Sequence, residues 1–239
     1  MRLFSICAII LSVNIMTKEK DINVNGNCYE RLPIKTKVFM NGDDLVSLID
    51  SYTANLLQDG DMVFISEKCV ACTQGRAIPM DEIKPSALAK FLSKFVTKTP
   101  HGIGLGIPET MHYAIKECGT LRILLAAFCS AIGKLFGKKG WFYIVAGDKA
   151  ASIDGPTPNT IPPYNHYVVL GPARPNEVAK EISERIKHPV FIVDINDLGG
   201  KVLGASDNSF DLEEIAHILK DNPLGQDHES TPLGIIRKI

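Results

Sequence analysis

The sequence predicts an α+β (mixed α/β) fold of two lobes, and three observations support this class. Its 239 residues suffice for one large domain or two small ones. Short apolar runs alternate with segments of helical period, the order expected of mixed sheets with flanking helices. Hydrophobic residues make up 45% and charged residues 22%, which argues against disorder and coiled coil. We expect a larger N-terminal portion and a smaller inserted or C-terminal lobe.

The first part of the chain is predicted to run strand, helix, strand. Lys35–Met40 is a short strand, and Asp43 or Asp44 then caps an amphipathic helix at Leu45–Leu57. The apolar run Met62–Ser66 follows a polar turn and is the second strand.

The middle of the chain is predicted to be mostly helical. Helices are expected at Pro85–Thr97 and from Pro108 to a break at Gly119. Small residues among the apolar ones of Leu121–Phe136 favour a buried, closely packed helix, and Trp141–Ala146 is expected to be a central strand.

The last part of the chain is again predicted to alternate strands and helices. A polar loop covers Asp148–Pro163, and a second polar loop covers Asn222–Pro232. The remaining pattern predicts strands at Tyr167–Leu170, Pro189–Asp194 and Leu233–Arg237, and helices at Asn176–Ile186 and Phe210–Lys220.

The N-terminal stretch Leu3–Met16 is apolar and about as long as a signal-peptide core. It is shorter than the roughly 20 residues that span a bilayer. A weak signal or anchor, a first core strand, and non-native sequence ahead of a start at Met16 all remain open, and we favour the last. We therefore expect a cytoplasmic protein.

Charge and cysteine usage exclude several classes. The formal net charge of −1 gives no overall basic field for nucleic acid, so we expect no nucleic-acid binding. We also expect no membrane partner. Cys69 and Cys72 form a lone CxxC that closes a strand-like run, without the second pair of ligands that zinc needs. Buried thiols that act as small hydrophobes are the favoured interpretation.

Carboxylates occur at three places next to predicted strands. Asp154 lies in the loop after Trp141–Ala146, Asp194 ends another strand, and Asp227 and Glu229 precede the last. Ligands of open α/β sheets bind beyond the carboxyl ends of strands, and carboxylates there suit Mg²⁺ together with phosphate. Any one such loop alone is equally typical of a turn or helix cap. We expect Asp154 and Asp194 to meet around a shared divalent ion.

Polar and cationic residues also follow the strand Met62–Ser66. Glu67 and Lys68 come directly after it, and Arg76 lies a few residues beyond. Lysine and arginine neutralise polyphosphates, although an exposed, solvated face is the common alternative.

Taken in order, these segments resemble the coenzyme F420 gamma-glutamyl ligase family from about Arg31 to the C terminus. The resemblance thus implies a ligase-like domain at 31–239 and leaves residues 1–30 outside it. The resemblance rests on the motifs Leu32-Pro33-Ile34, Gly42-Asp43-Asp44-Leu45, Gly75-Arg76, Ile153-Asp154, Val193-Asp194-Ile195-Asn196 and the acidic segment of Leu224–Arg237. Two departures stand out: a nucleotide-contacting lysine of the family falls near Cys72, and the threonine beside the second metal-binding aspartate is Ile195.

The resemblance implies a GTP-dependent, Mg²⁺- or Mn²⁺-dependent ligase that adds L-glutamate to coenzyme F420-0 or a related carboxylate, through an acyl phosphate. It also implies a homodimer. It assigns catalysis to Asp154 and Asp194, nucleotide binding to Leu32, Pro33, Ile34, Ser66, Glu67, Lys68, Arg76 and Asn159, and metal binding to Asp154, Asp194, Ile195, Asp227 and Glu229.

Two other functions remain open. One is a ligase that acts on a folate-like or peptide carboxylate. The other is a non-catalytic module that binds a nucleotide or another small ligand, which the departures at Cys72 and Ile195 would suit.

Overall fold

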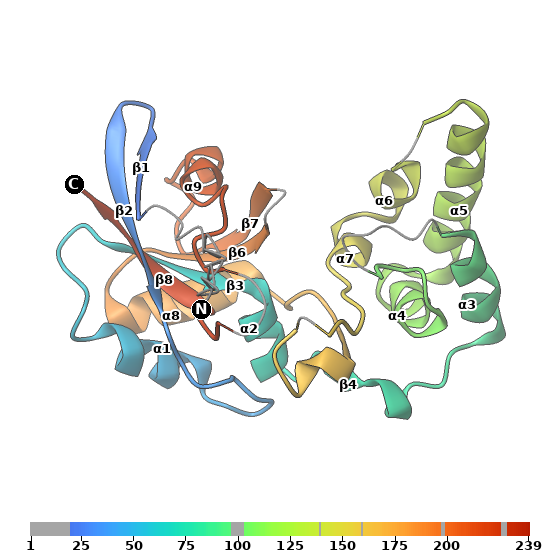
Figure 1. Ribbon diagram of the computed structural model, residues 1–239, viewed down its shortest axis with the longest axis horizontal. Coiled ribbons are helices and arrows are strands. Elements are labelled where there is room, and N and C mark those ends of the chain that lie inside the picture. The colour runs from blue at the N-terminus through green and yellow to red at the C-terminus, as the bar shows by residue number, and fades with distance from the viewer. Residues whose placement is uncertain (1–19, 97–102, 139, 159, 197–198, 226–228) are drawn as a thin grey trace, which may run out of the picture.

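The computed structural model describes residues 20–96, 103–138, 140–158, 160–196, 199–225 and 229–239. Its main lobe is built on a six-stranded sheet in the order β1-β2-β8-β3-β6-β7 (Figure 1). Only β3 and β6 pair in parallel, and the other neighbours are antiparallel. This mixed sheet confirms the predicted fold class. Its strands are β1 (Asp21–Val24), β2 (Asn27–Ile34), β3 (Met62–Ser66), β6 (Val190–Asn196), β7 (Gly199–Ala205) and β8 (Leu233–Lys238).

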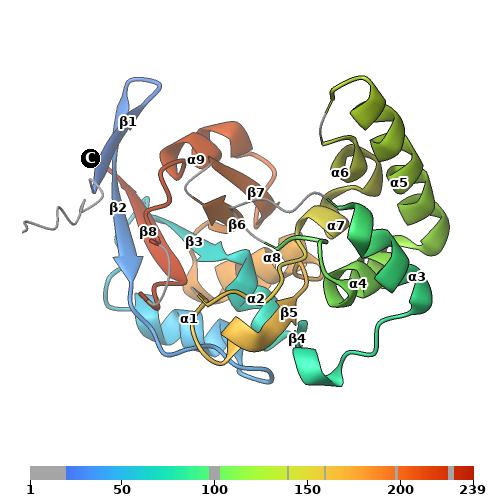
Figure 2. The same ribbon diagram turned by 45° about the vertical axis from the view of Figure 1, so that its right-hand side comes forward.

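Helices cover both faces of this sheet. Helices α1 (Leu45–Thr53) and α8 (Pro175–Ile186) pack on one face, and α9 (Leu212–Ile218) packs on the other (Figures 1 and 2). Alternate residues of a strand point to opposite faces. Accordingly, Ile65 packs in the layer of α1 and α8, while Phe64 packs in the layer of α9. Burial on both sides explains why β3 and β6 are apolar along most of their length.

A helical lobe is inserted between α2 (Glu67–Thr73) and the second half of the sheet (Figure 1). A two-stranded sheet, β4 with β5, lies where the chain enters and leaves it. The lobe has its own core, which includes Leu105, Met111, Ile123 and Ile153. Its elements are β4 (Ala77–Pro79), η1 (Met80–Glu82), α3 (Ala87–Leu92), η2 (Ser93–Phe95), α4 (Pro108–Cys118), α5 (Thr120–Leu135), α6 (Trp141–Ala146), α7 (Asp148–Ala151), η3 (Tyr164–His166) and β5 (Tyr167–Val169).

Two predicted strands are wrong. Lys35–Met40 has no regular structure, because the pairing of β2 with β8 ends at Ile34 opposite Leu233 and leaves the next residues without a strand partner there. Trp141–Ala146 is helix α6, whose Trp141 ring lies close against Gly133 of α5. Packing against the neighbouring helix has overridden the local preference of aromatic and β-branched residues for strands.

The predicted helix at Leu121–Phe136 exists as α5, but its burial was predicted wrongly. Ile123, Ala126 and Gly133 face the lobe core and are buried. Other large apolar residues of α5 point outward: Leu121 is 84% exposed, Leu125 55% and Phe128 63%. The packed side of α5 therefore carries Ile123, Ala126 and Gly133, and Leu121, Leu125 and Phe128 form an uncovered stripe.

The CxxC pair lies in helix α2, so the predicted strand-like setting is wrong. The prediction of buried thiols is confirmed for both residues, because Cys69 is 5% and Cys72 4% exposed. Burial raises the pKa of the Cys72 thiol to about 11, so the thiol is not poised as a nucleophile.

Within the described residues, no single helix is long and apolar enough to cross a membrane. Helices α4 and α5 would reach the required length and composition only as a pair, and they meet at a bend of 119°.

Candidate functional site

The candidate site lies at the carboxyl ends of the parallel pair β3 and β6. Ser66, the last residue of β3, is opposite Val193 in register, so the next residues of the two strands emerge side by side. These are Glu67, which opens α2, and Asp194. Strand pairing alone thus brings together side chains that are more than a hundred residues apart in the sequence.

Asp154 reaches the same place from the inserted lobe. It forms an antiparallel bridge with Val169 of β5, with backbone N–H···O distances of 2.8 and 3.0 Å. Lys68 of α2 then forms an ion pair with it, with 2.9 Å between the Lys68 Nζ and the Asp154 Oδ2. Both of these side chains are about half exposed, so a ligand can reach them.

The charges of this cluster act on one another. Burial, followed by the charges of Asp194 and Asp154, raises the pKa of Glu67 to about 9. Burial and the charge of Asp154 raise the pKa of Asp194, although Lys68 and Lys201 oppose the shift. The charge of Asp154 likewise raises the pKa of Lys68. These mutual effects place Asp154 and Asp194 in one electrostatic environment, which three carboxyl groups share with Lys68.

Glu67 is the most confined member of the cluster. It is 5% exposed, and its Oε2 atom is buried with no hydrogen-bond partner in the described structure. Buried polar atoms normally have a partner, so an unsatisfied carboxylate oxygen indicates a missing cation or donor. This orphaned oxygen and the excess of negative charge fit a hard divalent cation nearby.

The carboxylates do not by themselves enclose such an ion. Among the residues that the structure describes, no group of three His, Cys, Asp or Glu side chains is arranged to hold a metal. Mg²⁺ does not require one, because it commonly takes one or two protein carboxylates together with substrate phosphates and water. Asp154 and Asp194 therefore suit a cation that arrives with a phosphate.

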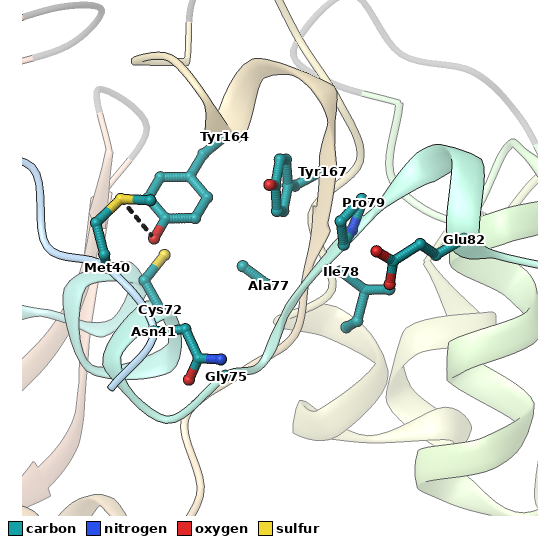
Figure 3. Close-up of a pocket in the computed structure, with 10 residues that line it drawn as sticks. All are labelled: Met40, Asn41, Cys72, Gly75, Ala77, Ile78, Pro79, Glu82, Tyr164 and Tyr167. Atoms are coloured by element: carbon teal, nitrogen blue, oxygen red, sulfur yellow. Dashed lines mark hydrogen bonds between the residues drawn. The ribbon is translucent and has the colours of Figure 1, made fainter. Parts of the chain in front are cut away.

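A cavity of about 340 Å³ lies further along α2, at Cys72 (Figure 3). Cys72 lies one helical turn after Lys68, on the same side of the helix, and its side chain borders the cavity. The Tyr164 hydroxyl donates a hydrogen bond to the Phe39 carbonyl at 2.7 Å and lies beside the Met40 sulfur. The lining contains no Lys or Arg and suits an uncharged ring better than a phosphate chain: Met40, Asn41, Cys72, Gly75, Ala77, Ile78, Pro79, Glu82, Tyr164 and Tyr167.

Arg76 is engaged away from the cluster. Its guanidinium donates to the Gly171 carbonyl and forms an ion pair with Glu117 of α4, at 2.7 Å between Nη2 and Oε2. In this arrangement Arg76 joins the main lobe to the helical lobe, and its contact with phosphate stays a prediction.

The other predicted residues are more scattered. Leu32 and Ile34 pack on the sheet core, and Pro33 between them is exposed. Ile195 packs beside the opposite core layer and could offer a metal only its backbone carbonyl. Glu229 is exposed and lies against Gly225. Their predicted roles stay predictions. Asn159 and Asp227 lie outside the described residues.

Sequence reasoning missed several residues near the site. Tyr143 of α6 lies close enough to Asp154 for that charge to help raise the pKa of its phenol, after burial. Met40 and Tyr164 line the cavity from segments far from α2. The usable signal in the sequence was the four-residue spacing of Lys68 and Cys72. In a helix such as α2, this spacing places both side chains on the same side.

Comparison with known proteins adds two findings. The model of the family described as F420-0:Gamma-glutamyl ligase matches residues 33–196, which include Glu67, Lys68, Asp154 and Asp194. The chain is also similar to the coenzyme F420:L-glutamate ligase of Methanopyrus kandleri, with 27% identity over 175 residues. That match covers 72% of this chain and 60% of the relative, so the chain spans less than two thirds of that protein.

Proposed function

The chain belongs to the F420-0:gamma-glutamyl ligase family, and from this premise we propose that it is a GTP- and divalent-metal-dependent ligase that joins L-glutamate to a carboxylate. The observation that supports the proposal is the convergence of Asp154, Asp194 and Lys68 at one sheet edge. F420-0 is the proposed acceptor, because the Methanopyrus relative is described as acting on F420 and glutamate.

The proposed reaction has two steps, because a free carboxylate does not react with an amine. An oxygen of the acceptor carboxylate attacks the γ-phosphorus of GTP, the bond to the β-phosphate oxygen breaks, and GDP leaves. The amine of glutamate then attacks the resulting acyl phosphate. Inorganic phosphate leaves with the electron pair of the broken C–O bond, the nitrogen loses a proton, and an amide forms.

The charge cluster suits the first step. Asp154 and Asp194 would hold Mg²⁺ or Mn²⁺, which when bound would neutralise charge on the transferring phosphoryl group. Lys68 is half exposed, so its ammonium group can turn from Asp154 toward phosphate oxygens. The cavity beside Cys72 would take an uncharged ring, either of the nucleotide or of the acceptor.

The test measures phosphate release from GTP with Mg²⁺, F420-0 and L-glutamate. We expect release only when the acceptor and the amino acid are both present, together with a product heavier than F420-0 by one glutamyl residue. ATP, a folate and a carboxyl-terminal peptide replace GTP or F420-0 in parallel reactions. Mn²⁺-dependent GTP binding without any turnover would instead identify a non-catalytic binding module.

We further propose that the chain forms a homodimer through α5. The exposed residues Leu121, Leu125, Phe128 and Leu135 recur at helical spacing, the pattern of a helix that packs on another helix. The double variant Leu125→Glu and Phe128→Glu is expected to be a monomer in sedimentation velocity, because forming the dimer would bury two glutamate charges in the α5 interface. Leu56→Glu, at an exposed residue of the main lobe, is the matched control. A monomeric wild type, or a variant that still dimerises, would contradict this interface.

A further inference from the structure

The cavity at Cys72 has the walls of a site for a flat ring. The Tyr164 and Tyr167 rings border it and meet edge to face, with 5.3 Å between their centroids. Ile78 and Pro79 of β4 add apolar surface (Figure 3). Apolar and aromatic walls with a few polar groups are typical of small-molecule sites. The volume of about 340 Å³ lies at the small end of such sites, which span roughly 300–1,000 Å³.

Two polar side chains interrupt these walls and are placed to orient a ring. Asn41 lines the cavity from the segment before α1, and Glu82 lines it from η1, on a different side (Figure 3). The Asn41 amide occupies space that a Cβ at Gly75 would need, since that atom would lie 2.8 Å from the Asn41 Oδ1. Within the described residues, neither the Asn41 nor the Glu82 side chain has a hydrogen bond or an ion pair. Both polar groups are therefore available to a ligand.

We propose that this cavity binds a fused ring with a 2-amino-4-oxopyrimidine edge, which guanine and the pterins share, and that Glu82 recognises this edge. The edge presents two adjacent N–H donors, one on the ring and one on the amino group. A carboxylate accepts through two oxygens, so it pairs with both donors at once. The Asn41 amide both donates and accepts, which suits the carbonyl and ring nitrogen atoms elsewhere on the ligand.

The same carboxylate discriminates against other rings. Adenine presents a nitrogen acceptor beside its amino group, so one oxygen of Glu82 would face a lone pair. The pyrimidinedione of a deazaflavin presents one N–H between two carbonyls, so one oxygen of Glu82 would face another oxygen. A site built to hydrogen-bond its ligand rejects analogues that leave its polar groups unpaired. Glu82 therefore favours guanine or a pterin over adenine or a deazaflavin.

The inference deepens the proposed function, and the choice between the two rings rests on that function. In a GTP-dependent ligase the ring is the guanine base. Because Cys72 lies one turn of α2 from Lys68, the phosphates of that nucleotide can extend from the cavity toward Lys68. In a ligase that acts on a folate-like carboxylate, the ring is the pterin of the acceptor. Glu82 has the same role in both cases.

The first arm of the test measures binding of GDP, IDP and ADP by calorimetry in the presence of Mg²⁺. The three nucleotides share the diphosphate, so differences in affinity report on the ring, and IDP lacks only the 2-amino group of GDP. We expect wild type to bind GDP about tenfold or more tightly than IDP or ADP. Glu82→Gln should lose most of this preference. Asp81→Asn, at an exposed neighbour in η1 that does not line the cavity, should keep it.

The second arm compares 6-carboxypterin with 6-carboxylumazine, which has an oxygen in place of the 2-amino group. A preference for the pterin that depends on Glu82, without a preference for GDP, would support the recognised edge and assign the cavity to a folate-like acceptor. No preference in either arm, or a preference unchanged in Glu82→Gln, would overturn the inference. A preference for GDP that depends on Glu82, in a protein that releases no phosphate with F420-0 and L-glutamate, would support the inference while the ligase proposal fails.

Discussion

Asp194→Asn is expected to lower kcat for GTP-dependent glutamate incorporation by roughly 10²- to 10³-fold, the loss typical when one group that offsets transition-state charge is removed. The side chain keeps its size, but it loses the charge that would hold the divalent cation beside Asp154. Mn²⁺ titration by calorimetry should show weakened binding in the same variant. Asp81→Asn, at an exposed residue of η1, should change neither quantity.

This loss should not come from unfolding. Burial and the charge of Asp154 raise the pKa of Asp194 above its ordinary value, so ionised Asp194 disfavours the unliganded fold. When the pKa of an acid is higher in the folded state than in the unfolded state, the fold loses stability as the pH rises from the unfolded-state pKa through the folded-state pKa. Near pH 8, Asp194→Asn should therefore match or exceed wild type in the midpoint of urea unfolding. A variant that keeps full activity would refute the catalytic role, and one that unfolds more easily would refute the electrostatic account.

The sequence correctly predicted those strands and helices whose residues follow a clear apolar pattern. Met62–Ser66 and the strand around Pro189–Asp194 are continuous apolar runs bounded by turns, and both are central strands in the structure. The helix cap was narrowed to Asp43 or Asp44, and in the structure the Asp44 side chain accepts a 3.2 Å hydrogen bond from the backbone of Ser47. These signals are local, so a single chain segment contains all the information they need.

The failures were elements whose state depends on a distant partner. The residues Trp141–Ala146 have strand preference but pack as a helix against α5. Strand β7 was missed because it includes glycines and a lysine and gains its structure by pairing with β6. The orientation of α5 could not be read either, because both of its sides contain apolar residues.

The site was partly predictable for a related reason. Asp194 ends one recognisable strand and Lys68 follows another, so their position at the sheet edge follows from the fold class. Asp154 does not, since its predicted strand is a helix and its bridge to Val169 places it instead. The burial and unsatisfied oxygen of Glu67 arise from the whole assembly, and no local pattern carries them.

Arg237→Met is expected to destabilise the fold by roughly 3 kcal/mol, the scale found when one partner of a buried ion pair is removed. Arg237 of β8 binds the Asp61 carboxylate with two bonds, at 2.9 Å from Nε and 2.7 Å from Nη2. Asp61 is 1% exposed, so the variant leaves a buried charge without its partner. Urea unfolding measures the change, and Arg185→Met is the matched control. Its pair with Asp50 is largely exposed, so its loss should cost less than about 1 kcal/mol.

The dependence of this effect on pH identifies its origin. Burial alone would raise the pKa of Asp61, but bonds from Arg237 and from the backbone N–H of Gln58 outweigh it, so the pKa is lowered. An acid whose pKa is lower in the folded state stabilises the fold fully at pH values above its unfolded-state pKa, which is near 4. This contribution is lost as the pH falls through the folded-state pKa. The difference in unfolding free energy between wild type and Arg237→Met should therefore be full at pH 7 and shrink below pH 4. A difference that stays constant across this range would assign the loss to the packing of the arginine side chain instead of its charge.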